Sequence, residues 1–136
     1  MSDYGALLNA LLEAERAGAR LLAAWVDELP AASSLGQQLR AMQRDEARNC
    51  AVLIHLLLEA GIAPSTATGE FYRKGLAVRG WHERLEFLNR GQAWVARRIA
   101  AALPGIPTPQ SRRLLQAMHD SHLVGTPEQL VASNAA

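Results

Sequence analysis

The chain has 136 residues, and its 14 basic and 13 acidic side chains leave a formal net charge of +1. That balance gives no electrostatic reason to expect nucleic acid or a membrane surface as a partner. The single cysteine, Cys50, excludes an internal disulfide, and no basic leader or apolar run of ~20 residues occurs, so we expect a cytoplasmic protein without a membrane span.

Helices are predicted along the whole chain, because alanine, leucine, arginine and glutamate dominate and no alternating β-branched run occurs. The first predicted helix covers residues 3–28. Ser34 and Gln37 form a capping-box pattern that begins a second helix over residues 34–60. The two helices are close enough in sequence to form an antiparallel hairpin.

A second predicted hairpin follows a long connection at residues 62–77, which is rich in turn-forming residues and holds at most a short helical piece. Its helices cover residues 79–103 and 109–124, and Thr108 and Pro109 are typical of a helix start. A short C-terminal helix is predicted after Thr126. Two amphipathic hairpins joined by a long link predict one all-α domain over residues 1–136, a four-helix bundle. The link is long enough for one crossover connection, and a simple up-down-up-down bundle is the alternative.

Polar residues interrupt the apolar stripe of each predicted helix. An antiparallel hairpin with its turn near Ala32 places Glu15 opposite Asn49 and within about one turn of Glu46. A second turn near Ile106 places His122 opposite residues 89–90, with Glu86 about one turn away. His119 is less well matched in level. The set of candidate ligands on the four helices is Glu15, Glu46, Asn49, Glu86, His119 and His122.

This combination of residue types predicts a metal site. Carboxylates and imidazoles three residues apart on a helix project the same way and bind divalent cations. Without an ion, buried carboxylates would repel one another and lose hydration, unless they were protonated and hydrogen-bonded. His82 and Cys50 are further candidates, although His82 and Glu86 at i, i+4 also suit a surface pair, and His122 suits a helix C-terminus.

The same residues resemble the ferritin-like carboxylate proteins, which supply one Glu from each of two helices and Glu-x-x-His from each of the other two. Glu15 lies in "EAERAGA", "EARN" is Glu46-x-x-Asn49, Glu86 lies in "RLEFLN", and "HDSH" is His119-x-x-His122. The order of these motifs around the long link is similar to that of rubrerythrin, bacterioferritin and small uncharacterised ferritin-like domains in which "FLNRGQ.WV" follows an "FY" crossover segment.

The resemblance implies a ferritin-like bundle that binds a divalent metal in its core, with iron and a di-iron pair as the family's usual case, a redox or metal-handling role and self-association as a homodimer. Asn49 replaces a histidine of the family pattern and His119 replaces a glutamate, so a one-metal site, a non-redox ion and a pocket without metal all remain open. The alternative function is a metal-free helical interaction or scaffold module with a polar core. The substrate and the catalytic residues do not follow from the sequence, which matches no nucleotide-binding motif.

Overall fold

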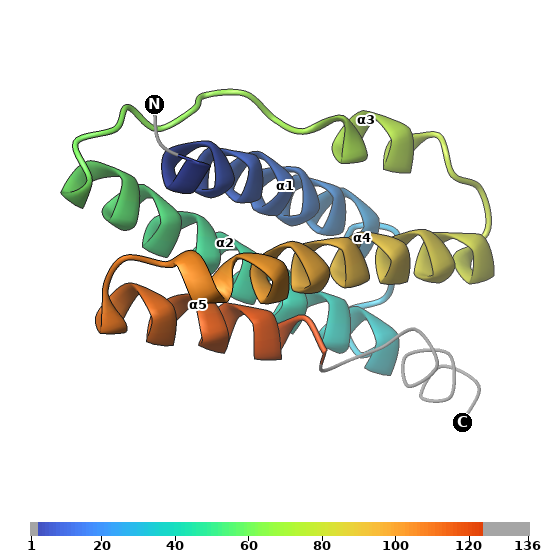
Figure 1. Ribbon diagram of the computed structural model, residues 1–136. Helices are drawn as coiled ribbons and strands as arrows, with labels where there is room; N and C mark the ends of the chain where they lie inside the picture. The colour runs from blue at the N-terminus through green and yellow to red at the C-terminus, as the bar shows by residue number, and fades with distance from the viewer. Residues whose placement is uncertain (1–2, 124–136) are drawn as a thin grey trace.

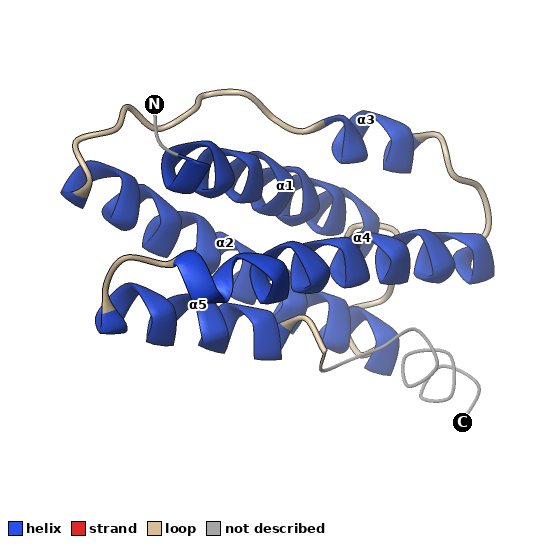
Figure 2. Ribbon diagram, viewed as in Figure 1, coloured by secondary structure: helices blue, strands red, loops and turns tan. Residues whose placement is uncertain are grey.

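The computed structural model describes residues 3–123, and every regular element in that range is a helix (Figure 2). The prediction of an all-α chain is therefore confirmed for this part of the chain, which contains no strand. The short helix predicted after Thr126 lies outside the described residues. Within residues 3–123, no helix is long and apolar enough to cross a membrane. The elements are α1 (Asp3–Val26), α2 (Ser34–Glu59), α3 (Glu70–Leu76), α4 (Trp81–Ala102), a 3₁₀ turn (Leu103–Gly105) and α5 (Pro109–Ser121).

The helix boundaries follow local capping chemistry. The N-cap of α2 is Ser33, whose hydroxyl accepts a hydrogen bond from the Gly36 N–H at 3.1 Å, so the predicted cap at Ser34 was one residue late. The predicted start of α5 is correct, because the Thr108 hydroxyl accepts from the Ser111 N–H at 3.0 Å and Pro109 is the first helical residue.

The helices pair along the chain (Figure 1). α1 and α2 lie antiparallel and contact each other along much of their length, and α4 and α5 form a second pair. The connection between the pairs runs along α1 from the end of α2 to the start of α4 and includes α3. Contacts between α1 and α4 are few by comparison.

Hydrogen bonds fasten the extended part of this connection to α1. The Asn9 amide donates to the Ala63 carbonyl at 3.3 Å, and its oxygen accepts from the Ser65 N–H at 2.8 Å. The Ser65 hydroxyl donates to Glu13 at 2.6 Å, and Arg16 donates to the carbonyl oxygens of Ser65 and Ala67. The Gly69 N–H donates to the Glu13 carbonyl at 3.1 Å. The connection is therefore held in a fixed position beside α1.

Two apolar clusters make up the core, and a polar layer separates them. On α1, Leu12 belongs to the first cluster and Leu21 to the second, and on α2, Leu53 belongs to the first and Leu39 to the second. The polar layer lies between these residues. One cluster consists of Leu7, Leu8, Leu11, Leu12, Leu53, Leu56, Leu57, Val95, Ile99, Ile106, Leu115 and Met118. The other consists of Leu21, Leu22, Trp25, Val26, Leu35, Leu39, Leu85 and Leu88.

Candidate metal centre

The polar layer contains two buried carboxylates on neighbouring helices. Glu15 of α1 is 1% exposed and Glu46 of α2 is 6% exposed. Gly18, one turn after Glu15 on α1, provides the space for the second carboxylate, because a Cβ at Gly18 would lie 2.7 Å from both oxygens of Glu46. The glycine thus lets the Glu46 carboxylate lie against the backbone of α1.

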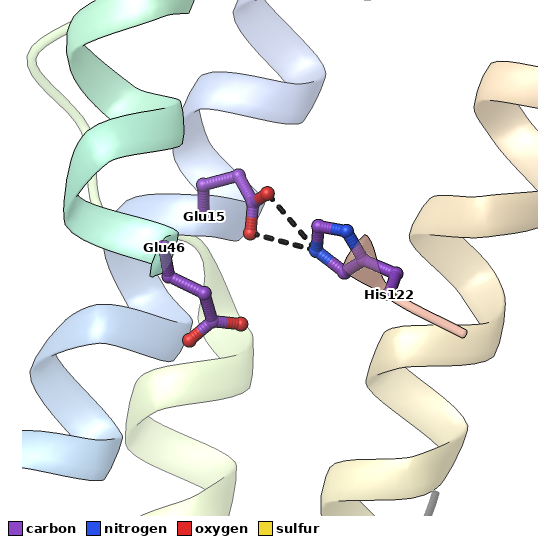
Figure 3. Close-up of side chains that lie close together, drawn as sticks. All are labelled: Glu15, Glu46 and His122. Carbon is purple, nitrogen blue, oxygen red and sulfur yellow. Dashed lines mark hydrogen bonds and ion pairs between the residues drawn. The ribbon is translucent and has the colours of Figure 1, made fainter. Parts of the chain in front are cut away.

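His122 brings an imidazole to the same place from the end of α5 (Figure 3). Its Nε2 lies 2.9 Å from Oε1 and 3.1 Å from Oε2 of Glu15. Its Nδ1 lies 2.7 Å from the Met118 carbonyl oxygen, which can only accept, so Nδ1 carries a proton. This contact fixes the orientation of the ring and leaves Nε2 directed at the carboxylates, as in histidines that bind metals.

Two side-chain amides complete the layer. The Asn49 amide of α2 donates to Glu15 Oε1 at 2.8 Å, and the Gln92 amide of α4 donates to Glu46 Oε1 at 2.9 Å. The second oxygen of Glu46, Oε2, is buried without a hydrogen-bond partner. A buried polar atom without a partner costs about 1–3 kcal/mol, so Oε2 is the least satisfied atom of the layer.

These contacts shift the ionisation of the layer. Burial, and then the negative charge of Glu15, raise the pKa of Glu46 well above its usual value. Burial works against a charged His122, but the hydrogen bond and charge of Glu15 outweigh it, so the pKa of His122 is raised. Burial also raises the pKa of the Cys50 thiol to about 11, so the thiol is protonated at neutral pH, and Cys50 does not belong to the group of close ligand atoms.

Three side chains of the layer offer ligand atoms close to one another. The ligand atoms of Glu15, Glu46 and His122 lie within 4.8 Å of one another. Around an octahedral ion with bonds of about 2.1 Å, neighbouring ligand atoms are about 3.0 Å apart and opposite ones about 4.2 Å apart. The separation of 2.9 Å between His122 Nε2 and Glu15 Oε1 matches neighbouring ligands, whereas 4.8 Å exceeds the largest octahedral separation, so an ion would have to draw the group slightly together.

A small cavity lies beside Glu46 and His122. It has a volume of about 10 Å³ and borders Glu46, Asn49, Gln92, Ser121 and His122. That volume is close to the minimum needed by one water molecule. A cation at the carboxylates would replace the Nε2 proton of His122, ionise Glu46 and provide a partner for Oε2 of Glu46. The donor set therefore fits one divalent ion.

Among the predicted ligands, the structure brings Glu15, Glu46, Asn49 and His122 together. The prediction that Glu15 lies opposite Asn49 in the first hairpin is confirmed by the hydrogen bond of 2.8 Å between their side chains. Asn49 contributes as a hydrogen-bond donor to Glu15, and its position beside the small cavity keeps it near any bound ion.

Glu86 and His119 lie elsewhere, which corrects the expectation that they join the cluster. Glu86 is exposed and pairs with His82, Nε2 to Oε1 at 2.6 Å. Glu86 precedes Gln92 by six residues. In a helix with 3.6 residues per turn, this separation places Glu86 about 120° around the helix axis from Gln92, and so away from the inner face. His119 turns toward Asp120, with Nδ1 at 3.0 Å from Oδ1.

Gln92 and Gly18 were not recognised as site residues from the sequence. Gln92 is buried between Leu88 and Val95 on the inner stripe of α4. A polar residue in an apolar stripe was the signal that identified Glu46, and it applied equally to Gln92. Gly18 gave a weaker signal, since a helical glycine facing a glutamate can be recognised only once the helix pairing is known.

Residues 4–128 match a protein family described as "Domain of unknown function (DUF6306)". The chain belongs to this family. Neither the curated proteins nor the solved structures gave a match. The matched span of the DUF6306 domain includes Glu15, Glu46 and His122, so the candidate centre lies within the domain that defines the family.

Proposed function

We propose that this domain binds one divalent transition-metal ion through Glu15, Glu46 and His122, with iron as the expected metal and a redox or metal-handling role. The observation that carries the proposal is the buried Glu15–Glu46–His122 group itself, with ligand atoms within 4.8 Å of one another. Two carboxylates and one imidazole suit iron, manganese or zinc. An ion held by three protein ligands would keep open positions for a small molecule.

We further propose that α1, α2, α4 and α5 form a ferritin-like four-helix bundle with α3 on its crossover. Two features support this proposal. The connection between the helix pairs runs along α1, and the inner polar residues come from all four helices at one level. We propose a single ion rather than a di-iron pair because Glu86 is exposed and His119 contacts Asp120 instead of the layer.

The second candidate function is the metal-free interaction or scaffold module. The hydrogen bonds of the layer favour it, because Asn49, Gln92 and His122 already provide partners for three of the four carboxylate oxygens. The two functions predict different states for the Oε2 atom of Glu46. A protonated carboxyl would keep this atom neutral, whereas a metal ion would bind it.

Metal analysis of protein purified without chelator distinguishes the two functions. We expect about one equivalent of a transition metal, its removal by EDTA, and a higher melting temperature when iron(II) or manganese(II) is added back, because a ligand that binds only the folded state stabilises it. His122→Ala and Glu46→Gln should each abolish stoichiometric binding. Glu86→Gln, which changes an exposed glutamate outside the layer, should bind as the wild type does.

The metal-free function predicts the opposite result. Protein that contains no metal as purified, takes up none and keeps an unchanged melting temperature after loading would overturn the metal proposal. A homodimer and a cytoplasmic location remain predictions, and light scattering of the purified chain measures the first of them.

A further inference from the structure

A second, larger cavity opens beside the polar layer. It has a volume of about 530 Å³ and lies between α1, α3 and α4. Its floor is formed by buried residues of the layer, Glu15, Glu46 and Gln92, together with Gly18. Pockets of about 300–1,000 Å³ are typical of small-molecule sites, so this one is large enough for an organic ligand.

Apolar and aromatic side chains form the walls of this pocket. Val95 of α4 and Ala14 of α1 lie on either side of it, and Phe71 of α3 stacks on Phe87 of α4 with ring centroids 4.4 Å apart. Trp94, which is 39% exposed, stands at the mouth. A ligand with an apolar or aromatic body would remove these surfaces from water.

The pocket carries side chains of both charges, and Arg90 is the lining cation without a carboxylate partner in the described part of the chain. Glu70 pairs with Arg73 and Lys74, and Glu13 is a carboxylate that accepts the Ser65 hydroxyl. Arg90 is exposed and has no ion pair or hydrogen bond within residues 3–123; its guanidinium lies 5.9 Å from the centre of the Phe87 ring. A planar guanidinium with unused donors is suited to two-point binding of a carboxylate.

We propose that this pocket binds a small amphipathic organic acid, with its acid group on Arg90 and its apolar body against the wall formed by Phe71, Phe87 and Trp94. The apolar end would reach toward Glu46 on the floor. This ligand site needs no metal ion. Where an ion is bound by Glu15 and Glu46, the far end of the ligand would face it, which would place an organic molecule next to the metal.

Calorimetry and tryptophan fluorescence test the proposal on the full chain with EDTA present. The probes are decanoate, decanol and decylamine below their micelle concentrations, which share one chain and differ in charge. We expect decanoate to bind at one site, to change the emission of Trp94, and to bind more tightly than the other two. Arg90→Gln should weaken decanoate about tenfold, as expected for one partly exposed charge-assisted hydrogen-bonded pair, and leave decanol unchanged.

Control variants assign the site. Arg97→Gln removes an exposed cation of α4 that does not line the pocket and should bind decanoate as the wild type does. Ala14→Phe fills the pocket and should abolish binding of all three probes, with folding checked by circular dichroism. Trp94→Phe should remove most of the fluorescence change while the calorimetric signal persists.

Three results would overturn the proposal. They are the absence of binding by any probe, tighter binding of decylamine than of decanoate, and equal effects of Arg90→Gln and Arg97→Gln. Because the experiment is done without metal, its failure leaves the metal site untouched. A failure to bind metal likewise leaves the organic-acid site standing.

Discussion

Replacing Glu46 with glutamine should remove a pH dependence of stability from the metal-free protein. Glu46 is 6% exposed, and burial followed by the charge of Glu15 raises its pKa well above 4.5. Between the unfolded and the folded pKa, the folded chain binds more protons than the unfolded chain. The free energy of unfolding therefore falls as the pH rises through this interval.

Between about pH 5 and pH 6.5, the titration of Glu46 should account for most of the change in the free energy of unfolding. One pH unit corresponds to about 1.4 kcal/mol for a single group, so the wild type should lose up to about 2 kcal/mol across it. His122 has little effect there, since its raised pKa gives stability that is fully present below the unfolded value of 6.5 and is lost only at higher pH. The lowered pKa values of Glu70 and Asp120 act at lower pH.

Urea unfolding with EDTA, followed by far-UV circular dichroism at both pH values, measures this loss. The Glu46→Gln variant should show nearly constant stability across the interval, because its amide does not titrate and keeps an oxygen to accept from Gln92. Glu86→Gln is the matched control and should retain the wild-type slope. Equal slopes in the wild type and Glu46→Gln would refute the assignment of a buried, proton-binding Glu46.

Three further predictions concern metal binding and the connection along α1. Metal affinity measured by calorimetry should rise between about pH 5.5 and pH 7.5. The reason is that binding must displace protons from Glu46 and His122, whose pKa values are raised. An affinity independent of pH would count against these ligands. Gly18→Ala should lower metal affinity about 10–100-fold by displacing the Glu46 carboxylate, whereas Gly105→Ala, in open space, should not. Arg16→Ala should speed proteolysis within residues 63–69, because two hydrogen bonds to that segment are lost; unchanged cleavage would show that these bonds do not hold it.

The sequence predicted the polar layer best where residues on α1 and α2 are joined by a short turn. Residues at equal sequence distances from that turn lie at one level, because both helices are regular and the turn is short. This rule correctly placed Glu15 opposite Asn49. The second hairpin was predicted less well. His122 reached the layer as expected, but Glu86 was placed inward although it lies next to Leu85 and away from the stripe that contains Gln92.

Other features of the centre depend on tertiary contacts that no single helix contains. The space that Gly18 leaves for Glu46 involves two helices. The contact of His122 with the Met118 carbonyl depends on where α5 ends. The large pocket depends on α3 and on its position against Phe87 and Gly91. The sequence allowed a short helical piece in this connection but gave neither its bounds nor its position. Such a short helix has little propensity signal of its own.

The attachment of residues 63–69 to α1 also limits how this family can vary in length. Asn9, Glu13 and Arg16 recur about once per turn of α1, and all three side chains form hydrogen bonds with Ser65. Asn9 also bonds the carbonyl of Ala63, and Arg16 also bonds that of Ala67. An insertion of one residue within 63–67 would therefore separate at least one of these carbonyls from its partner. Insertions and deletions among relatives should therefore be rare within residues 63–67.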